Sequence, residues 1–257
     1  MNFNLASASK SIHDVFSWFN DDLIIVFGDV ANYFDIYNIE NGKYKNQALS
    51  ILKQADIGIK DFNVIKDKKA NMLNLNEVTS FNNELMNNPS NLRGQIKIEN
   101  DYLYSIDIDT AFDVYGKDGK VVNKKDVMLL KEGDFNSEGT MRLFFYLGWI
   151  LLALDKGKTL FIDEFDSKLH CLLADYLLKL FNSIDKNPNN AQVIATLHNV
   201  LIMDGDFRRD QIYFTYKDEI GKSTLYSLFD VKGVRKEDLF SKKYLAEFYC
   251  KLPEFHK

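Results

Sequence analysis

Two adjacent carboxylates, Asp163 and Glu164, follow an apolar stretch near the middle of the chain. Residues 159–163 have the pattern of a short buried strand, and open α/β sheets bind ligands at the carboxyl ends of such strands. An acidic pair at this position costs free energy unless a cation or hydrogen-bond donors satisfy it. The pattern therefore predicts a Mg²⁺ site, because Mg²⁺ prefers carboxylate oxygens. The plainer alternative is that the two acids cap the next helix.

A second candidate segment, Ser137-Glu138-Gly139, lies at the start of a long apolar helix expected over residues 138–154. Backbone N–H groups at a helix N-terminus bind anions, and a glycine lets a phosphate approach closely. The segment therefore has the features of an anion-binding site. Ser137 could equally act only as the N-cap of the helix.

His198 follows an apolar strand expected over residues 193–196. The carboxyl ends of neighbouring parallel strands meet at one edge of a sheet, so His198 could reach the same phosphate as Glu164. A lone histidine is usually structural, and the functional interpretation depends on this position at a strand end.

The second half of the chain alternates helices with strands. The apolar periodicity predicts helices over residues 138–154 and 168–182, and strands over residues 159–163, 192–196, 211–217 and 223–229. This alternation is typical of an α/β domain with helices flanking a sheet that is parallel at least in its centre.

The first half is less regular. Its patterns indicate helices over residues 11–19 and 46–57, a buried strand over residues 23–27 and a β-hairpin between residues 102 and 122. Residues 66–94 are polar and rich in asparagine, which favours a mobile insertion. We therefore expect a helical and β-hairpin insertion region at residues 1–128. Residues 129–257 would form an α/β core that closes with an amphipathic helix over residues 236–249.

Composition argues against several classes of protein. The net charge of -5 and the pI of about 5.5 provide no overall attraction to nucleic acid. The longest apolar run, residues 143–154, is shorter than the roughly 18 to 20 residues of a membrane span. Cys171 and Cys250 lack the spacing of metal ligands, and the first ten residues lack a secretion signal. We expect a cytoplasmic protein with free thiols that binds neither membrane nor nucleic acid.

Five segments resemble bacterial AAA-type, ABC-like ATPases of the abortive-infection or anti-phage type, including relatives of the OLD ATPases. They are SEGTMRLFFYLG, LFIDEFDSKLH, AQVIATLHN, RRDQIYFTYKD and LFDVKGVRKED. The resemblance covers residues 129–255 and implies the C-terminal part of an ABC-type ATPase domain. It also implies ATP as the substrate, Mg²⁺ as the cofactor and a role in phage defence.

The resemblance implies catalytic roles at the two strand ends. Asp163 corresponds to the Walker B aspartate that supports Mg²⁺, and Glu164 corresponds to the acid that activates or positions water. His198 corresponds to the switch residue that senses the γ-phosphate.

Two further motifs of these ATPases lie at the interface between subunits. The signature motif, which contacts ATP bound by the opposite subunit, corresponds to Ser137, Glu138 and Gly139. The D-loop, which crosses the dimer interface, includes Asp166, Ser167 and Lys168. Arg142 matches an arginine of the signature helix, and its role does not follow from the sequence.

The phosphate loop of such an ATPase has the form G-x-x-x-x-G-K-[ST] after a strand. Gly157-Lys158-Thr159 is the only similar tripeptide, and it precedes its strand. We therefore expect this chain to lack the phosphate loop and to be the C-terminal half of a longer or split ATPase. The isolated chain would then bind no ATP with useful affinity and would be inactive by itself.

Three functions remain open at this point. The chain could belong to an ATP-driven dimer switch in anti-phage defence, whose partners are a second copy, a chain that carries the phosphate loop, and a defence effector. It could instead be a non-catalytic interaction protein that keeps only the signature and interface surfaces. A metal-dependent nuclease would use Asp163, Glu164 and Asp166.

Overall fold

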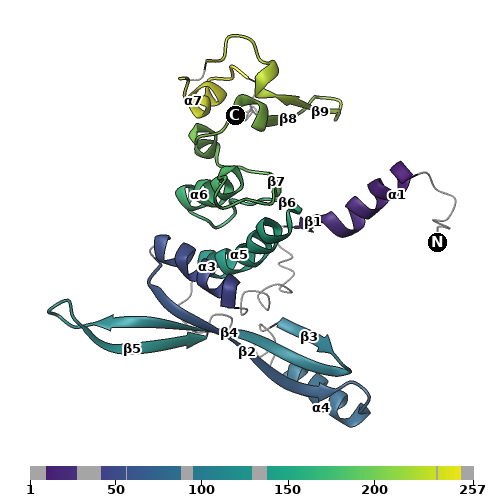
Figure 1. The fold of residues 1–257 in the computed structure, drawn as a ribbon, viewed down its shortest axis with the longest axis vertical. Helices are drawn as coiled ribbons and strands as arrows, with labels where there is room; N and C mark the ends of the chain where they lie inside the picture. The colour runs from purple at the N-terminus through teal and green to yellow at the C-terminus, as the bar shows by residue number, and fades with distance from the viewer. Residues whose placement is uncertain are drawn as a thin grey trace.

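A parallel sheet of three strands lies at the centre of the computed structural model, which describes residues 10–27, 42–55, 57–87, 95–128, 138–235 and 237–249. The strands are β1 (Leu23–Val26), β6 (Thr159–Ile162) and β7 (Gln192–Ala195), in the order β1-β6-β7. Helices α5 (Glu138–Lys156) and α6 (Cys171–Asn182) lie beside this sheet, and α3 (Gly42–Gln54) packs against α5 (Figure 1). The predicted α/β fold, with a parallel sheet flanked by helices, is confirmed.

Helix α5 is buried nearly all round because its sequence is apolar on every face. Eleven of its residues are buried, and they pack with Leu160 and Ile162 of β6, which are fully inaccessible to solvent. The alternate residues of the sheet point the other way. Ile25, Phe161 and Ile194 form a row in register across the three strands, and Ile25 and Ile194 are about half exposed. One face of the sheet therefore packs on the main core, while the other presents apolar side chains to solvent.

The first half of the chain also forms an antiparallel sheet. Its strands are β2 (Ile59–Asn71), β3 (Gln95–Glu99), β4 (Tyr102–Tyr115) and β5 (Val121–Met128), and β4 pairs with the other three. The predicted hairpin is β4–β5, which extends away from the body of the molecule (Figure 1).

Regular structure occupies most of the segment predicted to be a mobile insertion. Residues 66–71 belong to β2, and α4 (Leu75–Asn87) packs along that strand, whereas residues 88–94 lie outside the described part. Asn74 ends the turn before α4, and its side chain accepts the backbone N–H of Asn76 as in a helix cap. The asparagines that suggested mobility therefore include at least one capping residue. Mobility of the segment and the division at residue 128 stay predictions.

Two predicted helices begin later than expected. The helix predicted from residue 168 begins at Cys171 as α6, because Lys168 has a positive φ of 64° and His170 is the N-cap, whose Nδ1 accepts the backbone N–H of Leu172. The closing helix is reduced to α7 (Phe240–Leu245). None of the helices in the described part of the chain is long and apolar enough to cross a membrane.

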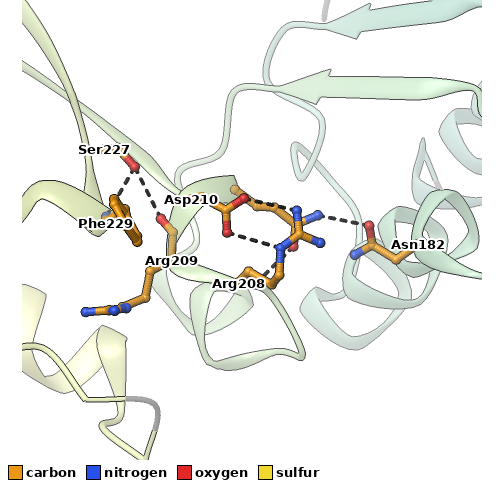
Figure 2. Close-up of polar contacts among 7 residues, drawn as sticks. Asn182, Arg208, Arg209, Asp210, Ser227 and Phe229 are labelled. Atoms are coloured by element: carbon orange, nitrogen blue, oxygen red, sulfur yellow. Dashed lines mark hydrogen bonds and ion pairs between the residues drawn. The ribbon is translucent and has the colours of Figure 1, made fainter.

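The strands predicted at residues 211–217 and 223–229 form a separate antiparallel pair, β8 (Tyr213–Lys217) and β9 (Ser223–Ser227). The polar residues before β8 fix this unit to its surroundings (Figure 2). Arg208 forms a two-pronged ion pair with Asp210, and the Gln211 amide donates to Asn182 at the end of α6. The RRDQ segment thus has a structural role in joining the β8–β9 pair to α6.

Candidate active site

The two predicted acids lie at the carboxyl end of β6, between β1 and β7. The backbone N–H of Asp163 donates to the carbonyl of Val26 at 3.0 Å, which extends the pairing with β1. Thr196 follows β7, and its hydroxyl donates to Asp163 Oδ1 at 2.6 Å. The same hydroxyl oxygen accepts the backbone N–H of Glu164 at 2.7 Å. The Thr196 side chain, directly after β7, therefore contacts both acids directly after β6.

Glu164 has a left-handed backbone, with a φ of 50°. For a residue other than glycine this conformation costs roughly 1–2 kcal/mol. It is held by Thr196 and by Phe165, whose N–H donates to the Thr196 carbonyl at 3.0 Å and whose buried ring packs on Tyr146. The turn aims the Glu164 side chain along the strand ends, so that Oε1 lies 3.6 Å from Nε2 of His198.

The Glu164–His198 contact is solvent-exposed, with 45% of the Glu164 side chain and 79% of the His198 side chain accessible. An exposed ion pair contributes little to stability. Its significance is geometric, because it joins the acid after β6 to the histidine after β7. The expectation that both residues reach one phosphate, and their catalytic roles, stay predictions.

Asp166, in the loop after β6, contacts the loop after β7 that carries His198. Its carboxylate accepts the backbone N–H of His198, at 3.1 Å from each oxygen, and the backbone N–H of Asn199 at 2.5 Å. The sequence analysis placed Asp166 on an interface between subunits. In the structure its carboxylate contacts the His198 loop of its own chain, and a role at an interface is untested.

The signature and D-loop candidates come together on a second side of the β6 loop. Glu138 is the first residue of α5, and its carboxylate lies 2.9 Å from Lys168 Nζ. The hydrogen bond and the charge of Lys168 lower the pKa of Glu138 from its ordinary value. Gly139 and Lys168 both line a cavity of about 530 Å³. Ser137 lies outside the described residues, and Ser167 is held in the loop by its N–H, which donates to the carbonyl of Glu164.

Arg142, whose role the sequence left open, is buried in the first half of α5. Its guanidinium carbon lies 5.7 Å from the centre of the Tyr146 ring, which in turn packs on Phe165. Arg142 thus supports the aromatic residues beneath the loop that carries Glu164.

Comparison with protein families gives one match, over residues 3–204. The matching family is described as "AAA domain, putative AbiEii toxin, Type IV TA system". The chain belongs to this family. It is an AAA-type, ABC-like P-loop ATPase domain of the abortive-infection type, and three of the five sequence segments that indicated this family lie within the matched residues. A comparison with curated proteins finds no match.

The match begins at residue 3 and so includes a segment near the N-terminus that partly resembles a phosphate loop. Residues 4–11 read Asn-Leu-Ala-Ser-Ala-Ser-Lys-Ser, which has the length and the Lys-Ser ending of a phosphate loop. Asn4 and Ser9 occupy the positions of the two glycines. Helix α1 (Lys10–Ser17) begins at the lysine and leads through the short π-helix η2 (Trp18–Asp22) into β1, which pairs with β6.

The segment departs from the phosphate-loop motif because both glycine positions carry residues with a side chain. The signal that remains is a Lys-Ser pair at the start of the helix that precedes a core strand, which is where the phosphate loop of a P-loop protein ends. The apolar pattern of residues 193–196 does not reveal a role for Thr196, and the signal that could have found it is a hydroxyl directly before Leu197 and His198.

The donor set at the carboxyl end of β6 suits Mg²⁺ held together with a nucleotide. Mg²⁺ in ATPases is bound by one or two protein carboxylates, by phosphate oxygens and by water. Asp163 provides one such carboxylate. Within the described ranges no three His, Cys, Asp or Glu side chains are grouped as a metal cage.

Proposed function

We propose that this AAA-family chain binds and hydrolyses ATP with Mg²⁺, and that ATP binding drives two copies together in a bacterial anti-phage response of the abortive-infection type. One observation carries the enzymatic part of the proposal. Asp163 and Glu164 after β6 and His198 after β7 lie at one edge of a parallel sheet, and Thr196 joins the two strand ends.

Each residue has a distinct task in this proposal. Mg²⁺ supplies positive charge to the phosphates, and Asp163 supports it. Glu164 orients the attacking water and accepts its proton. His198, 3.6 Å from Glu164, contacts the γ-phosphate and so couples the nucleotide to the loop after β7.

The phosphates require backbone N–H donors and a lysine, and residues 4–11 are our candidate for them. In a P-loop the lysine reaches the β- and γ-phosphates and the following hydroxyl contacts Mg²⁺. Lys10 and Ser11 would take these roles at the start of α1. Replacement of the glycines by Asn4 and Ser9 would weaken the loop, because a positive φ is less favourable for residues with a Cβ. We therefore expect weak ATP binding, instead of the absence of binding expected earlier.

The dimer is supported by the surface around the start of α5. Glu138 pairs with Lys168 at the start of α5, and Gly139 and Lys168 line the 530 Å³ cavity. In the proposed dimer these residues face the nucleotide of the other copy. A defence effector would respond to closure of the dimer.

The alternative function is a non-catalytic interaction protein, whose phosphate loop is supplied by another chain. The observation that favours it is the loss of both glycines from residues 4–11. A nuclease that uses Asp163, Glu164 and Asp166 is less compatible with the structure, because the Asp166 carboxylate accepts two backbone N–H groups from the His198 loop.

Calorimetry and phosphate release on the full chain test the proposal. We expect ATP with Mg²⁺ to bind and to be hydrolysed slowly, and Glu164→Gln to keep binding but to lose about 100- to 10,000-fold in turnover, the usual contribution of a general base. Asp163→Asn should raise the Mg²⁺ concentration needed for turnover.

Two outcomes would decide against ATP hydrolysis. Absence of ATP binding at millimolar concentration would favour the interaction protein. Unchanged turnover in Glu164→Gln would remove the catalytic role of that residue. Light scattering of Gly139→Asp tests the dimer separately: we expect the variant to fold and to stay monomeric with ATP.

A further inference from the structure

The Thr196 hydroxyl both donates and accepts a hydrogen bond, and both partners lie in the loop after β6. The proton goes to Asp163 Oδ1 at 2.6 Å, and the oxygen accepts from the Glu164 N–H at 2.7 Å. These two contacts fix the orientation of one carboxylate and the backbone turn that aims the other. A change of a few tenths of an ångström at Thr196 would therefore reach both acids together.

The backbone of Thr196 already completes the sheet without help from its side chain. Its N–H donates to the Ile162 carbonyl at 3.0 Å, and its carbonyl accepts the Phe165 N–H at 3.0 Å. Thr196 is also exposed, so its side chain buries little apolar surface. Strand pairing and burial therefore do not account for the hydroxyl, whereas contact with the two acids does.

Asp166 performs the reciprocal task. It comes from the β6 loop and accepts the N–H groups of His198 and Asn199, which follow β7. Asn199 in turn caps the 3₁₀ helix η5 (Val200–Asp204) by accepting the N–H of Leu201 at 3.0 Å. The loop that carries His198 is thus held on both sides.

We propose that Thr196 and Asp166 are positioning residues that hold Asp163, Glu164 and His198 as one unit for ATP hydrolysis, an inference that rests on the proposed function. Thr196 positions the two acids from β7, and Asp166 positions the histidine from β6. The acids after β6 therefore depend on Thr196, and the histidine after β7 depends on Asp166. Neither the acids nor the histidine would be correctly oriented without the side chain from the other loop. Partners of this kind, which hold the groups around a metal, typically change metal affinity or activity 10- to 100-fold when they are removed.

The test of Thr196 uses three variants of the full chain. Thr196→Val keeps the shape and removes the hydroxyl, Thr196→Ser keeps the hydroxyl, and Thr215→Val makes the same chemical change at an exposed position of β8. We expect Thr196→Val to lose 10- to 100-fold in kcat and to require more Mg²⁺, with a KM for ATP within a few-fold of the wild type. Thr196→Ser should restore most of the activity, and Thr215→Val should behave as the wild type.

A second measurement does not depend on turnover. Hydrogen exchange of the backbone amides reports the contacts directly, because the Glu164 N–H is held by the Thr196 hydroxyl and the His198 and Asn199 N–H groups are held by Asp166. We expect faster exchange at Glu164 in Thr196→Val, and faster exchange at His198 and Asn199 in Asp166→Ala, with unfolding midpoints close to that of the wild type. Asp185→Ala, at an exposed turn, is the matched control.

The outcomes separate the two proposals. If the wild type hydrolyses ATP, Asp163→Asn needs more Mg²⁺ to do so, and Thr196→Val is as active as the wild type, the positioning role is wrong and the proposed function stands. If the wild type shows no turnover, both fail, because there is no reaction for these residues to serve. A loss of activity in Thr196→Val that Thr196→Ser does not restore would also overturn the role of the hydroxyl.

Discussion

The parallel sheet is held differently at its two sides. Between β6 and β7, side-chain hydrogen bonds from Thr196 and Asp166 cross between the strand ends. On the other side, β1 is preceded by α1 and η2, in which four apolar side chains are between 51% and 61% exposed: Ile12, Val15 and Phe16 in α1, and Phe19 in η2. Helix α1 also projects away from the sheet (Figure 1). The acids are thus positioned by hydrogen bonds within the chain, whereas the apolar side chains described for α1, which follows the candidate phosphate loop, are mostly exposed.

The largest expected effect comes from replacing isoleucine by alanine, which we compare at two positions of this sheet. Ile162 is fully buried, and Ile25 is 49% exposed. Ile162→Ala should reduce the free energy of unfolding by about 2–5 kcal/mol, because it leaves a cavity in the core. Ile25→Ala should cost about 1 kcal/mol or less, as at other exposed sites. Urea unfolding measures both, and equal losses would show that the outer face of the sheet is covered in solution.

A smaller effect tests whether residues 4–11, which include the start of α1, bind phosphate. Lys10→Ala should weaken ATP binding by about 10- to 150-fold, which corresponds to a charged hydrogen bond of roughly 1.5–3 kcal/mol. Lys53→Ala, which removes an exposed lysine from the last turn of α3, is the control. If calorimetry gave the same affinity for Lys10→Ala and the wild type, residues 4–11 would not be the phosphate loop.

Tyr44, where α3 packs against α5, offers a pH-dependent test of packing around the core. Its hydroxyl donates to Asp155 at 2.7 Å and so joins α3 to α5. Burial first, and then Asp155, raise the pKa of Tyr44 from 10.0 to about 12. Because the folded pKa is above the unfolded value, this contribution to stability is complete below pH 10 and is lost as the pH rises towards 12.

Tyr44→Phe should therefore lower the free energy of unfolding by about 0.5–1.5 kcal/mol at neutral pH. The variant should also flatten the fall in stability above pH 10. Unfolding curves at neutral pH and at pH 11 give both quantities. A variant that loses stability above pH 10 as steeply as the wild type would contradict the assignment to Tyr44.

The smallest effect is expected at the exposed pair of Glu138 and Lys168. Because Lys168 lowers the folded pKa of Glu138 from 4.5, the pair stabilises the fold above that value and is lost as the pH falls through the lowered pKa. NMR titration should show the pKa of Glu138 returning towards 4.5 in Lys168→Gln. The stability should hardly change, since exposed pairs are screened by water and salt. An unchanged pKa would show that the contact does not persist in solution.

The sequence predicts those parts of the fold that depend on local apolar patterns. The strands at residues 23–27, 159–163 and 192–196 and the long helix α5 follow from runs of apolar residues, and the alternation of elements predicts the parallel sheet. Residues 59–71 were not assigned to a strand, because lysines and aspartates alternate irregularly there and pairing with β4 decides the structure.

The candidate site was predicted only in part for a similar reason. Asp163, Glu164 and His198 are visible because acids or a histidine end apolar strands. The role of Thr196 depends on the register of β6 and β7, which aligns Ile162 with Ala195 and so brings the next residues of both strands together. No local pattern encodes that alignment. The candidate phosphate loop was missed because its two glycines are replaced.

The base of the antiparallel arm lies against the helix that carries the signature residues. Phe62 near the start of β2 packs edge-to-face on Phe144 of α5, with 5.2 Å between the ring centres. From there β2 continues for nine residues to Asn71, a length of roughly 30 Å at about 3.3 Å per residue. Such an arm acts as a lever: a rotation of about 10° at its base displaces the far end by roughly 5 Å over that length. Small rotations of α5 would thus be amplified into movements as large as the width of a side chain.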